Sequence, residues 1–171
     1  MPDVNRTPSP PITVVIKITA DGHGELHDEV VYPTAQIGKD RHDIQKTFWN
    51  DQIKKRPKTL KLPAKPHAHD PNHQLWIVKK GDTVIWQCDR EFMLHVDYNL
   101  EPCDSLPGTP RNPFGWEGVQ KSKREGTGPH QVTGIVRSAF AADKDQMFYK
   151  FTAFVDGLEP LDPDGSTYHG P

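Results

Sequence analysis

Three histidines with metal-binding chemistry lie close together, at positions 67, 69 and 73. In an extended segment, side chains two residues apart point the same way, so His67 and His69 share a side. Pro71 favours a turn that brings His73 or Asp70 toward them. Imidazole and carboxylate ligands suit Zn²⁺, Cu²⁺ and Ni²⁺. The spacing predicts a candidate metal site at His67, His69 and His73, and the alternative is a solvated histidine-rich loop.

Two aromatic residues, Phe114 and Trp116, lie in the long stretch 99–129, which contains five prolines and five glycines. A connection of this length far exceeds the usual ~4–6 residues, which is typical of functional loops. Aromatic side chains on such a loop frequently dominate binding energy. The pattern therefore predicts Phe114 and Trp116 as partner-binding residues, and the alternative is that both rings anchor the loop to the core.

A basic segment, Lys54-Lys55-Arg56-Pro57-Lys58, could contact phosphates. However, the chain has a formal net charge of −2, and no aromatic residues alternate with these basic ones to stack on bases. We expect a solvated basic edge and no nucleic-acid binding.

Local catalytic motifs are absent from the sequence: there is no nucleophile elbow, phosphate-binding loop or metalloprotease helix. The sequence predicts neither catalytic nor cofactor-binding residues. It favours a protein that is not an enzyme.

The elements that must position these residues are mainly strands. Alternating apolar and polar side chains, typical of half-buried strands, predict them at 12–19, 29–32, 74–78, 83–88, 92–98, 131–140 and 147–155. Residues 40–53 fit a short helix, but Thr47-Phe48-Trp49 fits a strand equally well. Short strands with at most one short helix indicate an all-β, antiparallel β-sandwich.

The chain of 171 residues is expected to form one domain. Prolines at positions 2, 8, 10 and 11 predict an extended tail over residues 1–11. The sandwich is expected to span residues 12–155, and residues 156–171 are expected to form an irregular C-terminal tail.

Three segments together resemble the cupredoxin family: the hairpin Gly81-Asp82-Thr83-Val84-Ile85-Trp86, then His95, and later Tyr149-Lys150-Phe151. The resemblance implies a Greek-key sandwich in which Val84 and Trp86 face the core. It also implies that His95 stands where the family has its first copper-binding histidine.

The resemblance implies that Ala153 stands at the position of the family's copper-binding cysteine. A blue-copper site needs a thiolate and two imidazoles, and residues 154–158 also lack the expected histidine and methionine. Ala153 is in phase with Tyr149, Phe151 and Val155, which predicts a packed core residue. His95 is then either a strand histidine at the sheet surface or a further ligand of the candidate metal site.

The N-terminus lacks a basic region followed by a long apolar segment, which favours a cytoplasmic protein without a membrane span, or an exported one if a leader has been removed. The two cysteines, Cys88 and Cys103, are expected to be thiols, with a bridge between them as the alternative.

The sequence thus predicts a copper-free, cupredoxin-like binding or structural module that uses residues 99–129 to contact a protein partner or a second copy. No cofactor is expected. The alternative is a protein that binds Zn²⁺, Cu²⁺ or Ni²⁺ through His67, His69 and His73, with His95 if the fold brings it close.

Overall fold

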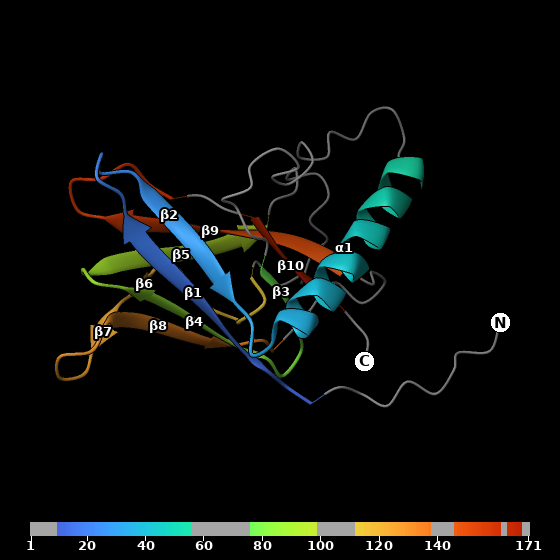
Figure 1. Cartoon of the computed structure of the whole chain (residues 1–171), viewed down its shortest axis with the longest axis horizontal. Helices are drawn as coiled ribbons and strands as arrows, with labels where there is room; N and C mark the ends of the chain where they lie inside the picture. Colours follow the sequence, from blue (N-terminus) through green and yellow to red (C-terminus); the bar gives the residue numbers. More distant parts are fainter. Residues whose placement is uncertain (1–9, 56–75, 99–111, 138–145, 162–163, 169–171) are drawn as a thin grey trace.

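The computed structural model describes residues 10–55, 76–98, 112–137, 146–161 and 164–168 (Figure 1). Within these residues, strands form two five-stranded sheets that pack face to face around one main core. The first, called the β1 sheet, has the order β2 (Leu26–Val31), β1 (Thr13–Ala20), β4 (Thr83–Cys88), β8 (His130–Ile135) and β7 (Lys123–Arg124). The second, called the β5 sheet, has the order β3 (Trp76–Lys79), β10 (Asp164–Tyr168), β9 (Gln146–Val155), β5 (Phe92–Tyr98) and β6 (Gln120–Lys121). The predicted all-β class is confirmed.

Both sheets are mixed, so the prediction of a purely antiparallel sandwich is wrong. β1 runs parallel to β4, with Val15 opposite Ile85, and β3 runs parallel to β10. The other pairs are antiparallel. The physical reason is the path of the chain, because a helix and a strand of the other sheet intervene between β2 and β4. Such a connection is long enough to return the chain to β1 in the same direction.

The short segment around Ser122 passes from one sheet to the other. β6 pairs with β5, and β7, two residues later, pairs with β8. At the crossing point the Ser122 amide donates to the Phe92 carbonyl, 2.9 Å away, and the Ser122 hydroxyl accepts from the Phe92 amide at 3.0 Å. This side of the sandwich is therefore joined by continuous chain.

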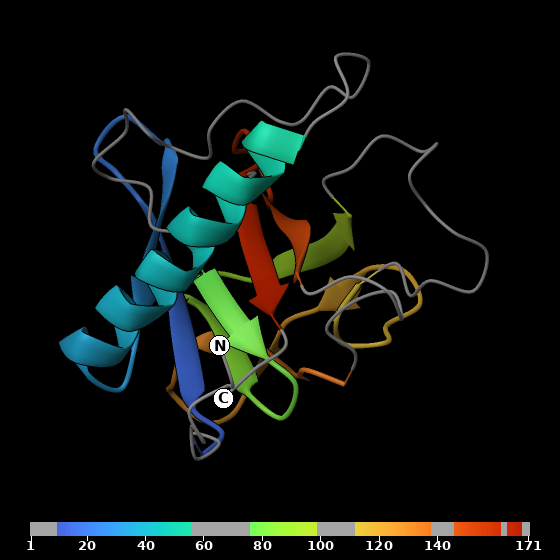
Figure 2. The same ribbon diagram turned by 90° about the vertical axis from the view of Figure 1, so that its right-hand side faces the viewer.

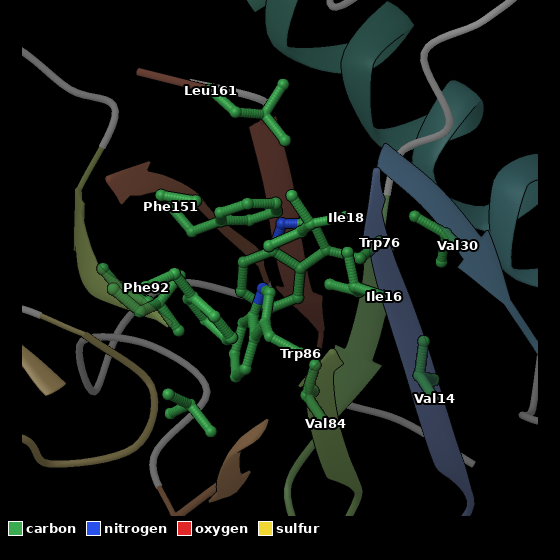
Figure 3. Close-up of a cluster of buried hydrophobic side chains, with 14 of the residues drawn as sticks. Val14, Ile16, Ile18, Val30, Trp76, Val84, Trp86, Phe92, Phe151 and Leu161 are labelled. Carbon is green, nitrogen blue, oxygen red and sulfur yellow. The ribbon is translucent and has the colours of Figure 1, made fainter. Parts of the chain in front are cut away.

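The core forms from the inward residues of the alternating strands. Val14, Ile16 and Ile18 of β1 are buried, as the period-two pattern predicts. Figure 3 shows the indoles of Trp76 and Trp86 in the middle of this cluster, near Ile16 and Ile18. The ring of Trp86 lies within 6 Å, centroid to centroid, of four other aromatic rings, those of Trp76, Phe114, Trp116 and Phe151.

Residues 35–55 form helix α1 (Ala35–Lys55), which is longer than the predicted 40–53 segment. The alternative strand at 47–49 is wrong. Thr34 caps the helix, because its hydroxyl oxygen accepts a hydrogen bond from the Ile37 amide at 3.2 Å. No helix in the described part of the chain combines the length and apolar composition that a bilayer span requires.

α1 lies against the β3 end of the sandwich (Figures 1 and 2). Gly38 allows the close approach, because a Cβ at this position would lie 2.8 Å from Cδ2 of Tyr32. Ile44 of the helix packs on Ile77 of β3 in a small cluster separate from the main core.

The predicted irregular C-terminal tail is wrong for Asp164–Tyr168. This segment forms β10, which lies between β3 and β9. Its sequence, Asp-Gly-Ser-Thr-Tyr, has no apolar alternation that would reveal a strand. The pairing is determined by backbone groups of the two neighbouring strands.

Candidate functional site

The predicted histidine cluster His67, His69 and His73 lies outside the described residues. His95 is described and lies on β5, where it is partly exposed. The hypothesis that His95 binds a metal ion together with these three histidines therefore stays a prediction.

His95 and Ala153 lie on opposite faces of the β5 sheet. Ala153 stands opposite Leu94 in the pairing of β5 with β9, and His95 stands opposite Thr152. Because successive side chains of a strand alternate between faces, the core face carries Leu94 and Ala153, both fully buried. The outer face carries His95 and Thr152. These two positions could not both bind one metal ion, even with a cysteine at 153.

The prediction of Phe114 as a partner-binding residue is wrong. Phe114 is 2 % exposed and stacks on Trp116, with ring centroids 4.6 Å apart. It also contacts the rings of Trp76 and Trp86 in the core. Trp116 is only partly exposed and packs against the core from its edge. The rings anchor this part of the segment, as the alternative interpretation proposed.

Asn112 fixes the turn that carries both rings. Its Oδ1 accepts hydrogen bonds from the amides of Phe114, at 3.1 Å, and Trp116, at 2.9 Å. Its Nδ2 donates to the Trp116 carbonyl at 2.8 Å. A deletion of residues 112–116 would therefore remove part of the core.

The β1–β2 hairpin brings together Asp21, Glu25 and His27, a group that the sequence analysis missed. One ligand atom from each residue lies within 4.8 Å of the other two. His27 Nε2 is 2.8 Å from Asp21 Oδ2, and Asp21 Oδ1 accepts from the amides of His23 and Glu25. The signal in the sequence is the spacing of an aspartate and a histidine across a glycine-rich turn.

Hydrogen bonding holds the Asp21 carboxyl in its ionised form. The bond from His27, together with those from the Glu25 and His23 amides, lowers the pKa of Asp21 from 3.8 to about 2. Because the folded pKa is depressed, the stabilisation is present above the unfolded value and is lost as the pH falls toward 2. The hydrogen bonds of Asp21 thus stabilise the β1–β2 hairpin. The same three side chains, Asp21, Glu25 and His27, are also close enough together to bind a divalent cation.

The outer face of β5, β6 and β9 gathers exposed apolar side chains. Met93 and Phe154 stand directly opposite each other and are 48 % and 39 % exposed. Lys121 of β6 stands on the other side of Met93, and Val119, half exposed, lies two residues before it. We call the surface formed by Met93, His95, Val119, Lys121 and Phe154 the β5–β6–β9 face. The sequence signal for this face was the presence of two apolar residues, Met93 and Phe154, at outward positions that alternate with the buried residues of β5 and β9.

Among the described residues, one large apolar side chain outside the β5–β6–β9 face is exposed to a similar degree. Ile135 lies on β8, in the other sheet, and is 54 % exposed. It has no exposed large apolar neighbour in that group, whereas Met93 and Phe154 are cross-strand partners. Ile135 is therefore a matched control for experiments on the β5–β6–β9 face.

Cys88 is a buried thiol at the end of β4. Burial raises the pKa of this thiol above its usual value, which keeps it protonated and unreactive. The predicted thiol is therefore observed at Cys88. Cys103 lies outside the described residues, and its thiol state stays a prediction.

No known protein family, curated protein or solved structure matches the chain.

Proposed function

We propose that the protein is a binding module without catalytic activity, and that its contact surface is the β5–β6–β9 face. The observation that carries the proposal is the cross-strand pair of Met93 and Phe154, both exposed on an otherwise polar sheet surface. Val119 and Lys121 belong to the 99–129 segment, so the proposal keeps part of that segment as contact surface and transfers the apolar anchors from Phe114 and Trp116 to strand residues.

The energetics favour contact at this place. Burial of a methionine or phenylalanine side chain contributes about 1.5–3 kcal/mol. Residues on paired strands are held in position before binding, so little conformational entropy is lost when a partner binds. Lys121, exposed beside Met93, adds a positive charge at the rim. The partner we propose is a protein that presents apolar side chains with an acidic group beside them.

The scaffold we propose is a copper-free, cupredoxin-like Greek-key sandwich. Burial of Val84 and Trp86 supports it, because the resemblance implies that both face the core. The copper-free part of the proposal is supported by the register of β5 with β9, which puts His95 and Ala153 on opposite faces of the sheet. We further propose a cytoplasmic location, without nucleic acid as a partner.

The experiment compares the proteins captured by four full-length chains: wild type, Met93→Glu, Phe154→Glu and the control Ile135→Glu. Circular dichroism and thermal denaturation first establish that each variant folds. Affinity capture with quantitative mass spectrometry then measures binding. The proposal predicts a specific partner that both face variants lose and that Ile135→Glu retains. Equal loss in all three variants, or no loss in the face variants, contradicts it.

Metal binding is a second candidate function, favoured by the convergence of Asp21, Glu25 and His27. This candidate differs from the predicted cluster at His67, His69 and His73. Isothermal titration calorimetry with Zn²⁺, Cu²⁺ and Ni²⁺ measures metal binding by untagged protein. It compares wild type with His27→Ala and with the variant in which His67, His69 and His73 are all alanine. Loss in one variant assigns the site, and absence of binding to wild type rejects the function.

A further inference from the structure

Met93 places a thioether within the β5–β6–β9 face. The residue is 48 % exposed, and Phe154 of β9 stands directly opposite it. Lys121 of β6 stands opposite it on the other side. His95, two positions later on β5, projects from the same face of the sheet. The sulfur is therefore open to solvent, and its strand neighbours are an aromatic and a cationic residue.

The thioether of methionine reacts with hydrogen peroxide to give a sulfoxide. A sulfur lone pair attacks one peroxide oxygen, the S–O bond forms and the O–O bond breaks. The proton of the transferred oxygen passes to the leaving hydroxide, which becomes water. The sulfur loses two electrons and the peroxide gains them. Sulfoxide reductases reverse the change, because two thiols become a disulfide and the oxygen leaves as water.

Cys88 offers a second sulfur atom, but its surroundings protect it. The residue is 3 % exposed at the end of β4, and its Sγ lies 3.7 Å from Asp89 Oδ1. Burial raises the pKa of this thiol, so it stays protonated. Peroxide attacks the thiolate form of cysteine, whereas a thioether has no proton to lose. Both exposure and protonation state therefore direct peroxide toward Met93 in preference to Cys88.

Oxidation of Met93 would change the face at one of its apolar anchors. A thioether can be covered by apolar side chains, whereas the oxygen of a sulfoxide accepts hydrogen bonds and is costly to bury without a donor. Lys121, exposed on the neighbouring strand, carries such a donor. Its ammonium group would then bind the sulfoxide oxygen in place of the partner's acidic group. One added oxygen atom thus weakens the apolar contact and the ionic contact together.

We propose that Met93 is a site of reversible oxidation by hydrogen peroxide, and that its sulfoxide releases the partner from the β5–β6–β9 face. This inference rests on the proposed function of that face and adds its regulation. The reductant is a thiol-dependent sulfoxide reductase. Loss of one buried methionine side chain from an interface corresponds to binding that is at least about tenfold weaker.

The first measurement locates the oxidised sulfur. The full-length protein is treated with hydrogen peroxide, once folded and once in urea, and peptide mass spectrometry follows Met93 and Cys88. In the folded chain Met93 should gain one oxygen before Cys88 reacts. Urea should reverse this order, because the unfolded thiol is exposed and ionises more readily. The rate at Met93 should be the same at pH 6 and pH 8.

The second measurement compares capture of the partner before and after oxidation of the same protein. The partner is the protein that untreated wild type captures and that Met93→Glu loses. Oxidised wild type should capture at least about tenfold less of it. A sulfoxide reductase with dithiothreitol should restore capture, and dithiothreitol alone should not, since it reduces oxidised cysteines but not a methionine sulfoxide.

The matched control moves the methionine to the other sheet. In the double variant Met93→Leu/Ile135→Met, position 93 cannot be oxidised, and the new thioether stands at a position where the native residue is 54 % exposed. Peroxide should oxidise position 135 of this variant, as peptide mass spectrometry can establish. Its capture of the partner, compared with that of the same variant before treatment, should not change.

Three results would overturn the inference. The first is a folded chain in which Cys88 is oxidised before Met93. The second is a wild-type protein with oxidised Met93 that captures as much partner as before. The third is an equal loss of capture in the double variant, because another group would then be responsible. If no captured protein depends on Met93 in untreated chains, the proposed function fails and this inference fails with it, whereas the three results above leave the proposed function intact.

Discussion

Arg41 of α1 and Asp82 of the β3–β4 turn form an ion pair in which the two side chains are 4 % and 0 % exposed. Asp82 also accepts hydrogen bonds from the amides of Ile12 and Lys79. One carboxylate thus connects the start of β1, the end of β3 and the helix. The aspartate that the sequence analysis assigned to a hairpin turn determines how three elements meet.

Removal of one partner of this pair leaves a buried charge without compensation. Arg41→Met should lower the free energy of unfolding by about 3–5 kcal/mol. The double variant Arg41→Met/Asp82→Asn should lose less than the sum of the two single variants. Urea denaturation of all four proteins measures the coupling. Additive losses would show that the two side chains do not stabilise each other.

Gly134 of β8 gives the stacked rings of Phe114 and Trp116 their space. A Cβ at this position would lie 2.6 Å from Phe114 Cδ1 and 2.7 Å from Trp116 Cζ2. Gly134→Ala should therefore destabilise the fold by about 1–3 kcal/mol. The control is Gly22→Ala, since an added Cβ there meets no atom within 4 Å. A Gly134→Ala protein as stable as this control would show that the rings of Phe114 and Trp116 do not pack closely against Gly134.

Ala153→Cys should not create a blue-copper site. The new thiol would lie in the core beside Leu94, whereas His95 lies on the outer face. Added Cu²⁺ should produce no intense visible thiolate-to-copper absorption, and His95→Ala should leave the spectrum of this variant unchanged. An intense band that disappears in the double variant would contradict the assigned strand register.

His42 of α1 should make stability depend on pH. Burial against the sandwich lowers the pKa of His42, with a smaller opposing effect from Asp43, and its ring lies edge-on to Tyr32. Because the folded pKa lies below the unfolded value of about 6.5, folding favours the neutral ring. The contribution is complete above that value and is lost as the pH falls below it. The denaturation midpoint is measured at pH 5 and at pH 7.5 for wild type and for His42→Gln. The change in midpoint between the two pH values should be larger for wild type than for the variant. Equal differences would exclude His42 as the cause.

Local periodicity predicted most of the strands correctly. The alternation in β1, β4, β5 and β9 follows directly from one buried and one outer face, and residues such as Val14 and Phe151 behave accordingly. The burial of Ala153 followed from the same phase. These features depend on residues close together in the chain.

Features that depend on distant residues were missed. β10 has no apolar alternation and exists because β3 and β9 present backbone groups to it. β6 and β7 contain two residues each and are defined by their neighbours. The burial of Phe114 depends on Gly134, which is 20 residues later and leaves room for the ring. Periodicity carries no information about such contacts.

For the candidate site, the sequence identified the 99–129 segment but assigned the wrong side chains within it. Large aromatic residues are common both at interfaces and in cores, so residue type alone did not separate the two. Met93 and Phe154 are 61 positions apart, and their contact depends on the register of β5 with β9.

The measurement that tests the proposed binding surface most directly is site-specific photo-crosslinking in the cells that express the protein. A photoreactive phenylalanine analogue replaces Phe154 in one full-length chain and Ile135 in another, since both positions are exposed on outer sheet faces. We expect a specific adduct from position 154 that Met93→Glu abolishes and that position 135 does not give. The same adducts from both positions, or none from position 154, would contradict it.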